Sequence, residues 1–384
     1  MTSPPGNIIL SLIIEVFLGT NKAFSVGHNQ GETMFESIKI KNLRAITDLE
    51  INNLGQVNLF VGQNNCGKTT LLEGLFFLVG ATNPRLPFSA NTFRGLNLMS
   101  KELWRTFFHN MDVTVSIEIS GEMSTTKEEQ KLLVRPLKKK ARATEPAVSD
   151  FVSLEVEPSD SKPPFIPDGL ELEYTTTNNP TDKTISEIFL QGNELVTEGA
   201  KERDIRGVFV NPLTIYEWKD RFAKVQRKKR IGEVISLLRE IEPTISDIRL
   251  NEVGLLEFDI GLPSLLPANL MGGGIAKFLS VALAMIDCEN GIVLIDELEN
   301  GLHHSAQQKI WKAIINWAQD LNVQVFATTH SNECVKAFKN SADTTLFESE
   351  AKLYRIERKE EKFRAVEYTK ELLGESLESN WEVR

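Results

Sequence analysis

The chain contains 384 residues, of which 25% are charged and 8% aromatic, and this composition is typical of a soluble globular protein with one large or two smaller domains. The net charge of −10 argues against a general polyanion-binding surface, although a local basic patch remains possible. The three cysteines have neither paired nor metal-ligand spacing and suit a reducing cytoplasm: Cys66, Cys288 and Cys334.

We expect neither a membrane span nor a secretion signal in the N-terminal segment. Its apolar run at residues 8–18 is too short to cross a bilayer and contains Glu15, and no basic residue precedes it. We expect the regular fold to begin near Met34. Residues 1–33 are then an extension, or the product of an upstream start codon.

Three strands and a helix are expected next. Apolar positions predict strands at residues 35–43 and 49–51, and VNLFV at residues 57–61 predicts a buried strand. From Thr69 onward, apolar residues recur at helical spacing. Between the third strand and the helix lies GQNNCGKT, an uninterrupted GxxxxGK[ST] phosphate loop at residues 62–69.

The chemistry of phosphate binding explains the residue types in this loop. Gly62 and Gly67 let backbone N–H groups converge on phosphate oxygens, at the positive end of the helix dipole. We expect Lys68 to reach the β- and γ-phosphates and the Thr69 hydroxyl to bind Mg²⁺. Cys66 is expected to be a small filler rather than a redox switch. An ordinary glycine turn is the alternative, which the position between strand and helix disfavours.

The middle of the chain is harder to interpret. KELWRTFFH predicts a short helix, residues 113–119 predict a strand, and residues 121–205 predict a strand-rich lobe with solvated loops. The basic run at residues 135–142 could touch nucleic acid, but a solvated loop or helix face is the favoured interpretation.

A buried strand at residues 207–215, ending near Pro212, precedes a long helical section. That section contains the basic cluster Arg227–Arg230 and then an amphipathic run that ends at Pro243. No heptad pattern persists long enough for an extended coiled coil.

A second glycine loop, LMGGG, leads into a helix that is apolar nearly all round. Its glycines again create an anion-binding helix N-terminus. Because one nucleotide hardly needs two such loops, we expect this loop to cap the γ-phosphate held by another copy of the chain. Its residues are Gly272, Gly273 and Gly274.

Two carboxylates follow the apolar strand IVLI at residues 292–295. Such a strand is expected at the centre of a parallel sheet, so Asp296 and Glu297 lie at its carboxyl end beside the phosphate loop. Asp296 is predicted to hold Mg²⁺ through a water, and Glu297 to polarise the attacking water. The alternative is that both residues cap the next helix.

His330 follows another buried strand, VQVFA at residues 323–327, and is expected at the same edge of the sheet. There it can donate a hydrogen bond to the γ-phosphate, although a lone histidine is more often structural. The pair His303 and His304 has no partner spaced to complete a metal site, and we expect it in a loop.

The order of these motifs resembles the ATP-binding-cassette heads of the SMC, RecF and OLD-type ATPases. FESIKIKNLRAITDLEI is similar to their usual start, DELENGLHH to their carboxylate segment, and YRIER with EVR to their usual end. The likeness covers residues 34–384 and is greatest to compact prokaryotic members without a nuclease domain, including ATPase subunits of anti-phage defence systems such as PARIS or Septu.

This resemblance implies an α/β fold: an ABC-type ATPase head with a mixed or parallel central sheet, a strand-rich N-terminal part and a helical lobe. The chain then divides into Walker A (62–70), an insert (about 121–205), a helical lobe (about 216–290), and Walker B with the C-terminal part (291–384). His330 becomes the switch histidine and residues 272–274 the signature loop. Arg44 matches an arginine that relatives often carry near the nucleotide. The implied nucleotide ligands are Arg44, Gly62, Gln63, Asn64, Asn65, Cys66, Gly67, Lys68, Thr69 and Thr70.

Departures from the family pattern also carry information. The loop MGGG differs from the transporter signature LSGGQ, and the missing coiled coil argues against an SMC arm. The residues after His330 are too few for the nuclease domain of OLD proteins, and we identify no Q-loop glutamine.

We therefore expect a cytoplasmic, magnesium-dependent ATPase that does not associate with a membrane. Two or more copies are expected to pair through composite nucleotide sites and to control a separate effector. In similar proteins the effector is often a nuclease or toxin that acts in anti-phage defence. Two alternatives remain. One is a RecF-like repair ATPase that binds duplex DNA through its basic residues, and the other is an ATP-binding assembly scaffold with little turnover.

Overall fold

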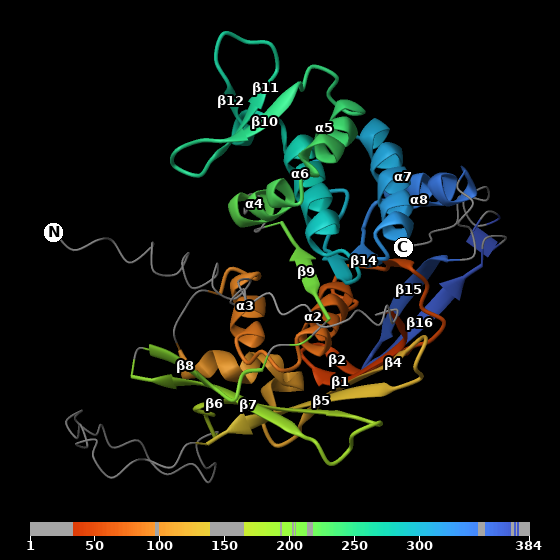
Figure 1. Ribbon diagram of the computed structural model, residues 1–384. Helices are drawn as coiled ribbons and strands as arrows, with labels where there is room; N and C mark the ends of the chain where they lie inside the picture. The colour runs from red at the N-terminus through yellow and green to blue at the C-terminus, as the bar shows by residue number, and fades with distance from the viewer. Residues whose placement is uncertain are drawn as a thin grey trace, which may run out of the picture.

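A helix held between two β-sheets forms the centre of the molecule (Figure 1). The computed structural model describes residues 34–96, 100–138, 165–192, 194–201, 203, 205–212, 218–344, 350–369, 372, 373 and 375. The central helix is α2 (Lys68–Val79), which contacts strands of both sheets. Every residue of α2 except Thr69 is buried, so the helix that follows the phosphate loop is enclosed on all sides.

The first sheet is antiparallel throughout. Its strands lie in the order β2-β1-β4-β5-β6-β7-β8. In β4 every second residue is buried, as expected for a strand with one face against a core. The bounds are β1 (Phe35–Leu43), β2 (Ile46–Ile51), β4 (Ile117–Met123), β5 (Glu129–Leu137), β6 (Gly169–Thr176), β7 (Thr184–Gln191) and β8 (Glu194–Glu198).

The second sheet has six strands in the order β16-β15-β3-β14-β13-β9. All neighbours are parallel except β15 and β16. The bounds are β3 (Val57–Val61), β9 (Gly207–Val210), β13 (Ile292–Ile295), β14 (Gln324–Thr328), β15 (Ala351–Lys359) and β16 (Lys362–Tyr368). The predicted α/β fold with a mixed, largely parallel central sheet is confirmed.

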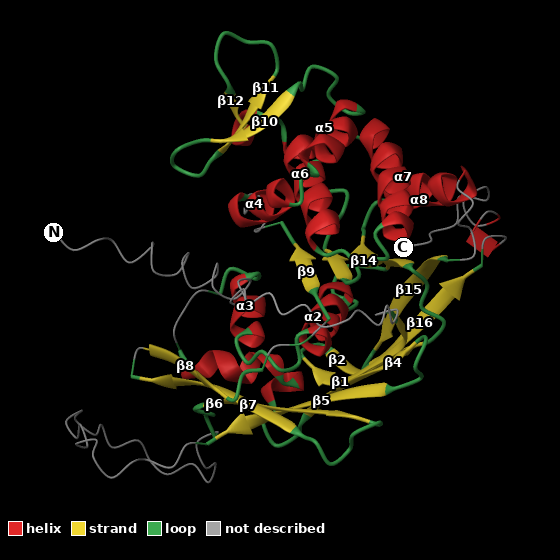
Figure 2. Ribbon diagram, viewed as in Figure 1, coloured by secondary structure: helices red, strands yellow, loops and turns green. Residues whose placement is uncertain are grey.

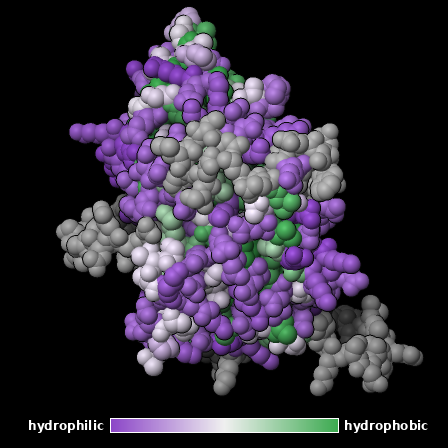
Figure 3. All heavy atoms as spheres, turned by 90° about the vertical axis from the view of Figure 1, so that its right-hand side faces the viewer, coloured by the Kyte–Doolittle hydropathy of each residue, from purple (hydrophilic) through white to green (hydrophobic). Residues whose placement is uncertain are grey.

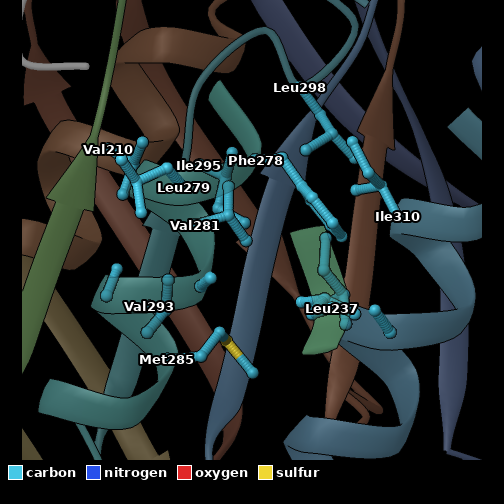
Figure 4. Close-up of a cluster of buried hydrophobic side chains, with 14 of the residues drawn as sticks. Val210, Leu237, Phe278, Leu279, Val281, Met285, Val293, Ile295, Leu298 and Ile310 are labelled. Atoms are coloured by element: carbon cyan, nitrogen blue, oxygen red, sulfur yellow. The ribbon is translucent and has the colours of Figure 1, made fainter. Parts of the chain in front are cut away.

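Separate cores lie on the two faces of this second sheet. In β3, Val57, Leu59 and Val61 face one core and Phe60 faces the other. The Phe60 core includes α2 and the first sheet. The opposite core includes α6 (Gly273–Asp287), α7 (His304–Asp320) and α8 (Asn332–Thr344). Figure 4 shows side chains of α6 packed against those of β13. Burial on both faces explains why β3, β9, β13 and β14 are apolar without alternation.

The remaining elements form two groups. One group is a lobe at the top of the view in Figure 2, and the other lies near α2. The lobe contains α4 (Lys219–Arg227), α5 (Ile231–Arg239), and an antiparallel sheet of β10 (Asp247–Leu250), β11 (Leu256–Asp259) and β12 (Leu266–Pro267). The other helices are α3 (Leu86–Thr92) and the 3₁₀ helices η1 (Lys101–Phe107), η2 (His109–Met111) and η3 (Ala268–Leu270).

Several boundaries differ from the prediction. β2 begins at Ile46 rather than at residue 49, and β9 ends at Val210, before Pro212. The strand expected at residues 113–119 begins only at Ile117, because the Asp112 carboxylate binds the N–H and hydroxyl of Thr114 and forms a turn. The helical section expected after residue 216 consists of two short helices, separated at Lys229, whose φ is +59°. The second of these, α5, ends at residue 239, before Pro243.

Some predictions fall outside the described residues: the extension at residues 1–33, the basic residues from Lys139 to Arg142, and the chain end at residues 376–384. Within the described part of the chain, no helix is both long and apolar enough to cross a membrane. The face shown in Figure 3, the right-hand side of Figure 1, is mainly hydrophilic.

Candidate active site

The phosphate loop connects β3 to α2 and is tightly enclosed. Gly62 has a φ of +147°, and a Cβ there would lie 2.4 Å from the carbonyl oxygen of Ile356 in β15. Gly67 has a φ of +95° and occupies the N-cap of α2. Both positions therefore require glycine, one because of a close backbone approach and the other because of a left-handed conformation.

Lys68 lies inside this loop. Its Nζ donates to the carbonyl oxygens of Gly62 at 2.7 Å and Gln63 at 3.0 Å, and the residue is 5% exposed. Burial lowers the pKa of Lys68 from its ordinary value. Cys66, 3.7 Å from this ammonium, is also buried, and burial raises the pKa of its thiol, as suits a space-filling residue. The loop thus bends around one ammonium group.

Asp296 lies directly opposite the start of α2. Its carboxylate accepts a hydrogen bond from the Thr69 hydroxyl at 3.0 Å and another from Thr328 at 2.6 Å. Burial raises the pKa of Asp296, whereas these hydroxyl bonds lower it. β13 and β14 carry Asp296 and Thr328 to the edge of the sheet where β3 ends. The structure therefore brings the two predicted magnesium ligands together.

Glu297 and His330 also meet at this edge. The imidazole Nε2 of His330 lies 3.7 Å from the Glu297 carboxylate, and each side chain is 35% exposed. Asn300 donates to the second oxygen of the same carboxylate. Glu297 has a φ of +49°, a left-handed angle that costs a non-glycine residue roughly 1–2 kcal/mol. Glu297 and His330 thus form a partly exposed pair of titratable side chains at this edge of the sheet.

Neither carboxylate caps the following helix, so that alternative is wrong. The N-cap of α7 is His303, whose ring accepts from the N–H of Ser305. His304 is the first helical residue, so the loop predicted for the histidine pair is half wrong. Among the described residues, no group of three or more His, Cys, Asp or Glu side chains could hold a metal ion.

Arg44 is placed beside α2 rather than on the open side of the loop. Its guanidinium binds the Glu73 carboxylate at 2.8 Å and lies over the ring of Phe107. Burial lowers the pKa of Arg44. A second arginine, Arg94, binds the same carboxylate at 2.7 Å, and its Nη2 lies 3.4 Å from the Thr70 hydroxyl. The sequence analysis missed Arg94, which is the more exposed arginine, at 34% against 10%.

The glycine loop at residues 272–274 is exposed on one side and contacts its own chain on the other. Gly272 and Gly273 are exposed, and a Cβ at Gly272 would meet nothing within 4 Å. A Cβ at Gly274 would lie 3.0 Å from the carbonyl oxygen of Gly301, which follows the carboxylates. The loop is therefore open to the outside and contacts the carboxylate segment on the inside.

Lys277 is the second residue that the sequence analysis missed. It is 1% exposed, and its Nζ donates to the backbone carbonyl oxygen of Asp296 at 2.9 Å. Burial lowers the pKa of Lys277 to about 8, against the attraction of nearby carboxylates, of which that of Asp296 is the largest. One lysine inside an otherwise apolar buried helix was the signal for it.

These residues fit a nucleoside triphosphate with Mg²⁺. A loop with two required glycines encloses a lysine, and the adjacent helix N-terminus supplies N–H groups for phosphate oxygens. Thr69 and Asp296 offer the oxygen ligands that Mg²⁺ prefers. When bound, the metal would neutralise phosphate charge.

This sheet, phosphate loop and carboxylate pair define an ABC-type ATPase head of the SMC, RecF and OLD-like group. The chain belongs to the family described as "AAA domain, putative AbiEii toxin, Type IV TA system", whose model matches residues 57–335.

Known proteins of similar sequence include two that cover most of the chain. An ATP/GTP phosphatase of Helicobacter pylori is 24% identical over 84% of this chain and 92% of its own length. The OLD nuclease of Thermus scotoductus is 23% identical over 78% of this chain and 59% of its own length. A solved SMC head bound to the C-winged helix domain of ScpA is 11% identical and covers 87% of this chain and 97% of that chain, with a TM-score of 0.46.

Proposed function

We propose that this ATPase is a switch whose heads pair in the ATP-bound state and separate after hydrolysis. Each nucleotide would lie between the phosphate loop of one chain and Gly272–Gly274 of another. The contact between Thr69 and Asp296 is the single observation that carries the hydrolytic half of this proposal, because it joins the Walker A and Walker B segments in one site.

Each residue has a distinct role in the proposed reaction. Lys68 exchanges its carbonyl partners for the β- and γ-phosphates. Thr69 and Asp296 would hold Mg²⁺, which would neutralise charge on the phosphates. Glu297 orients and polarises the attacking water, and His330 donates to the γ-phosphate. The backbone N–H groups of the loop residues Gln63, Asn64, Asn65, Cys66 and Gly67 and the hydroxyl of Thr70 bind the remaining phosphate oxygens.

The shape of the glycine loop supports pairing. Neither Gly272 nor Gly273 has a left-handed φ, and neither is crowded within its own chain. A glycine that folding does not require is useful when another molecule must approach the backbone closely. The N-terminus of α6 then offers its N–H groups to the partner's γ-phosphate.

We propose that the paired state controls a separately encoded effector, a nuclease or toxin, in cytoplasmic anti-phage defence. The family description names a toxin and a toxin–antitoxin system, and one relative is named a nuclease. The described cysteines are all free and buried, as suits a reducing compartment.

The test combines hydrolysis with native mass for the natural chain and for Glu297→Gln. Phosphate release from ATP and from GTP should fall about 100-fold in the variant, because the general base is lost. The mass without nucleotide should stay that of the natural chain, and ATP should drive Glu297→Gln into a stable larger particle.

Two results would contradict this proposal. A slow basal rate that Glu297→Gln leaves unchanged would favour the scaffold alternative. A particle mass that never responds to ATP would exclude nucleotide-dependent pairing, and the glycine loop would then have no partner chain to act on.

A further inference from the structure

The peptide bond between Asp296 and Glu297 is held at both of its polar ends. Its carbonyl oxygen accepts from the Lys277 ammonium at 2.9 Å, and its N–H donates to the Thr328 hydroxyl at 2.9 Å. The same hydroxyl donates to the Asp296 carboxylate at 2.6 Å. Two side chains from two different elements, α6 and β14, thus determine how this one peptide plane is turned.

The orientation of that plane matters because Glu297 follows it in a left-handed conformation, with a φ of +49°. A glutamate adopts this angle only where its surroundings fix it. If the plane turned, Glu297 would relax to an ordinary angle, and its carboxylate would move away from His330, now 3.7 Å distant. Fixing the orientation of the Asp296–Glu297 peptide therefore also fixes the position of the Glu297 carboxylate.

Burying the Lys277 ammonium costs free energy, which argues that this charge is kept in order to fix the orientation of the Asp296–Glu297 peptide. Its neighbours in α6, Ala276 and Phe278, are each 1% exposed, and the rest of the helix is almost wholly apolar. Figure 4 shows Phe278 and other α6 side chains filling the core against β13. A leucine or methionine could fill the same space without desolvating a charge.

A half-buried carboxylate, that of Glu299, lies on the other side of the site. Glu299 accepts from the backbone N–H of His330 at 2.5 Å. Its other carboxylate oxygen is buried and has no hydrogen-bond partner among the described residues. Among the charges that raise the pKa of Lys277, the Glu299 carboxylate has the second-largest effect, after that of Asp296. The ammonium thus compensates a carboxylate whose own task is to position His330.

We propose that Lys277 is a positioning residue for ATP hydrolysis, which together with Thr328 clamps the Asp296–Glu297 peptide and keeps Glu297 aimed at the attacking water. This inference rests on the role proposed above for Glu297. Lys277 acts through that peptide, to whose carbonyl oxygen its ammonium donates.

The experiment is a double-mutant cycle in the full chain. The variants are Lys277→Met, Lys277→Gln, Glu297→Gln and the double variant Lys277→Met with Glu297→Gln. The control is Lys224→Met, which removes a lysine bound to Asp287 at the far end of α6, 3.3 Å away. Steady-state hydrolysis with saturating Mg²⁺ gives kcat and KM, and thermal unfolding reports folding.

Lys277→Met should lower kcat about tenfold or more and leave KM within about twofold, since ATP binding does not use the clamp. Lys277→Gln should keep more of the rate, because its amide can still donate to the Asp296 carbonyl. Lys224→Met should behave as the natural chain. In the Glu297→Gln background, Lys277→Met should have no further effect, because the carboxylate that it positions is gone.

Two results would overturn the inference while Glu297→Gln still behaves as proposed. One is a Lys277→Met enzyme with normal kcat. The other is a full additional loss in the Glu297→Gln background, which would place the effect on Asp296 or on folding. If Glu297→Gln alone kept the natural rate, the proposed function would fail first. If Lys277→Met does not fold, the same cycle is carried out with Lys277→Gln.

Discussion

Glu73 shows how a single residue fixes the surroundings of the phosphate-loop helix. Its carboxylate, on a side chain that is 1% exposed, accepts from both Arg44 and Arg94. The cluster carries one surplus positive charge next to Thr70. Arg94 is the more exposed member and already touches the Thr70 hydroxyl, which makes it the better placed of the two to meet a phosphate.

Arg44→Ala tests whether Arg44 supports the fold or the nucleotide. Removing the more buried arginine strips a partner from Glu73 and a donor from Asn91, so the free energy of unfolding should fall by about 3 kcal/mol. Denaturant titration measures this loss. Arg94→Ala should cost less stability, because Arg94 is more exposed. A weaker ATP affinity at full stability would instead assign Arg44 to the nucleotide, as the family resemblance implies.

Among single residues, the sequence predicted the site residues that belong to motifs of known spacing. It missed the residues whose role depends on a contact formed only in the folded chain. Lys68, Thr69, Asp296 and His330 follow strands that end at one edge, so their proximity could be expected. Lys277 and Arg94 could not be found this way, because hydropathy patterns do not show which buried charge meets which carbonyl or carboxylate.

Four strands of the second sheet, β3, β9, β13 and β14, were predictable because burial on both faces leaves a continuous apolar run, whereas the charged and partly exposed β15 and β16 were not predicted. Boundaries set by a single side chain or backbone angle were not. Asp112 forms the turn that delays β4, and Lys229 separates α4 from α5 by one left-handed residue. Neither feature changes the overall hydropathy pattern, so the pattern placed the start of the strand too early and did not mark the break within the helical section.

The two glycine loops should respond in opposite ways to substitution. Gly272→Glu adds a side chain into open space, so the free energy of unfolding should change by less than about 0.5 kcal/mol. The added negative charge faces the expected phosphate, so ATP-driven assembly of the Glu297→Gln chain should be lost. Native mass and denaturant titration report the two effects separately.

Gly62→Ala is the matched control for that substitution. A Cβ there collides with the backbone at Ile356 and requires an unfavourable φ, so stability should fall by about 2 kcal/mol even without nucleotide. If Gly272→Glu proved equally destabilising, the openness of the second loop would be refuted. If it left assembly intact, that loop would not act across chains.

For the whole molecule, the charge pairs around Arg227–Arg230 argue against a DNA-binding surface. Lys228 donates to the Ile286 carbonyl oxygen and pairs with Glu289 at 3.5 Å. Arg230 pairs with Glu233 at 2.7 Å. Two of the four cations are thus already matched within the chain, in a molecule whose net charge is −10.

We expect duplex DNA to bind weakly and with a shallow dependence on salt. The logarithm of the binding constant against that of the salt concentration measures how many phosphates are contacted. A steep slope that Lys228→Ala and Arg230→Ala reduce would favour the RecF-like alternative over the effector switch.

The arrangement of the second sheet has a consequence for synthesis. β3 lies between β14 and β15, and Gly62 packs against the carbonyl of Ile356, so the phosphate loop is bordered by residues made about 300 positions later. On the ribosome, the nascent loop has neither neighbour, and the apolar faces of β3 are uncovered. We therefore expect a growing chain to complete the border of its phosphate loop only after Ile356 has emerged from the ribosome.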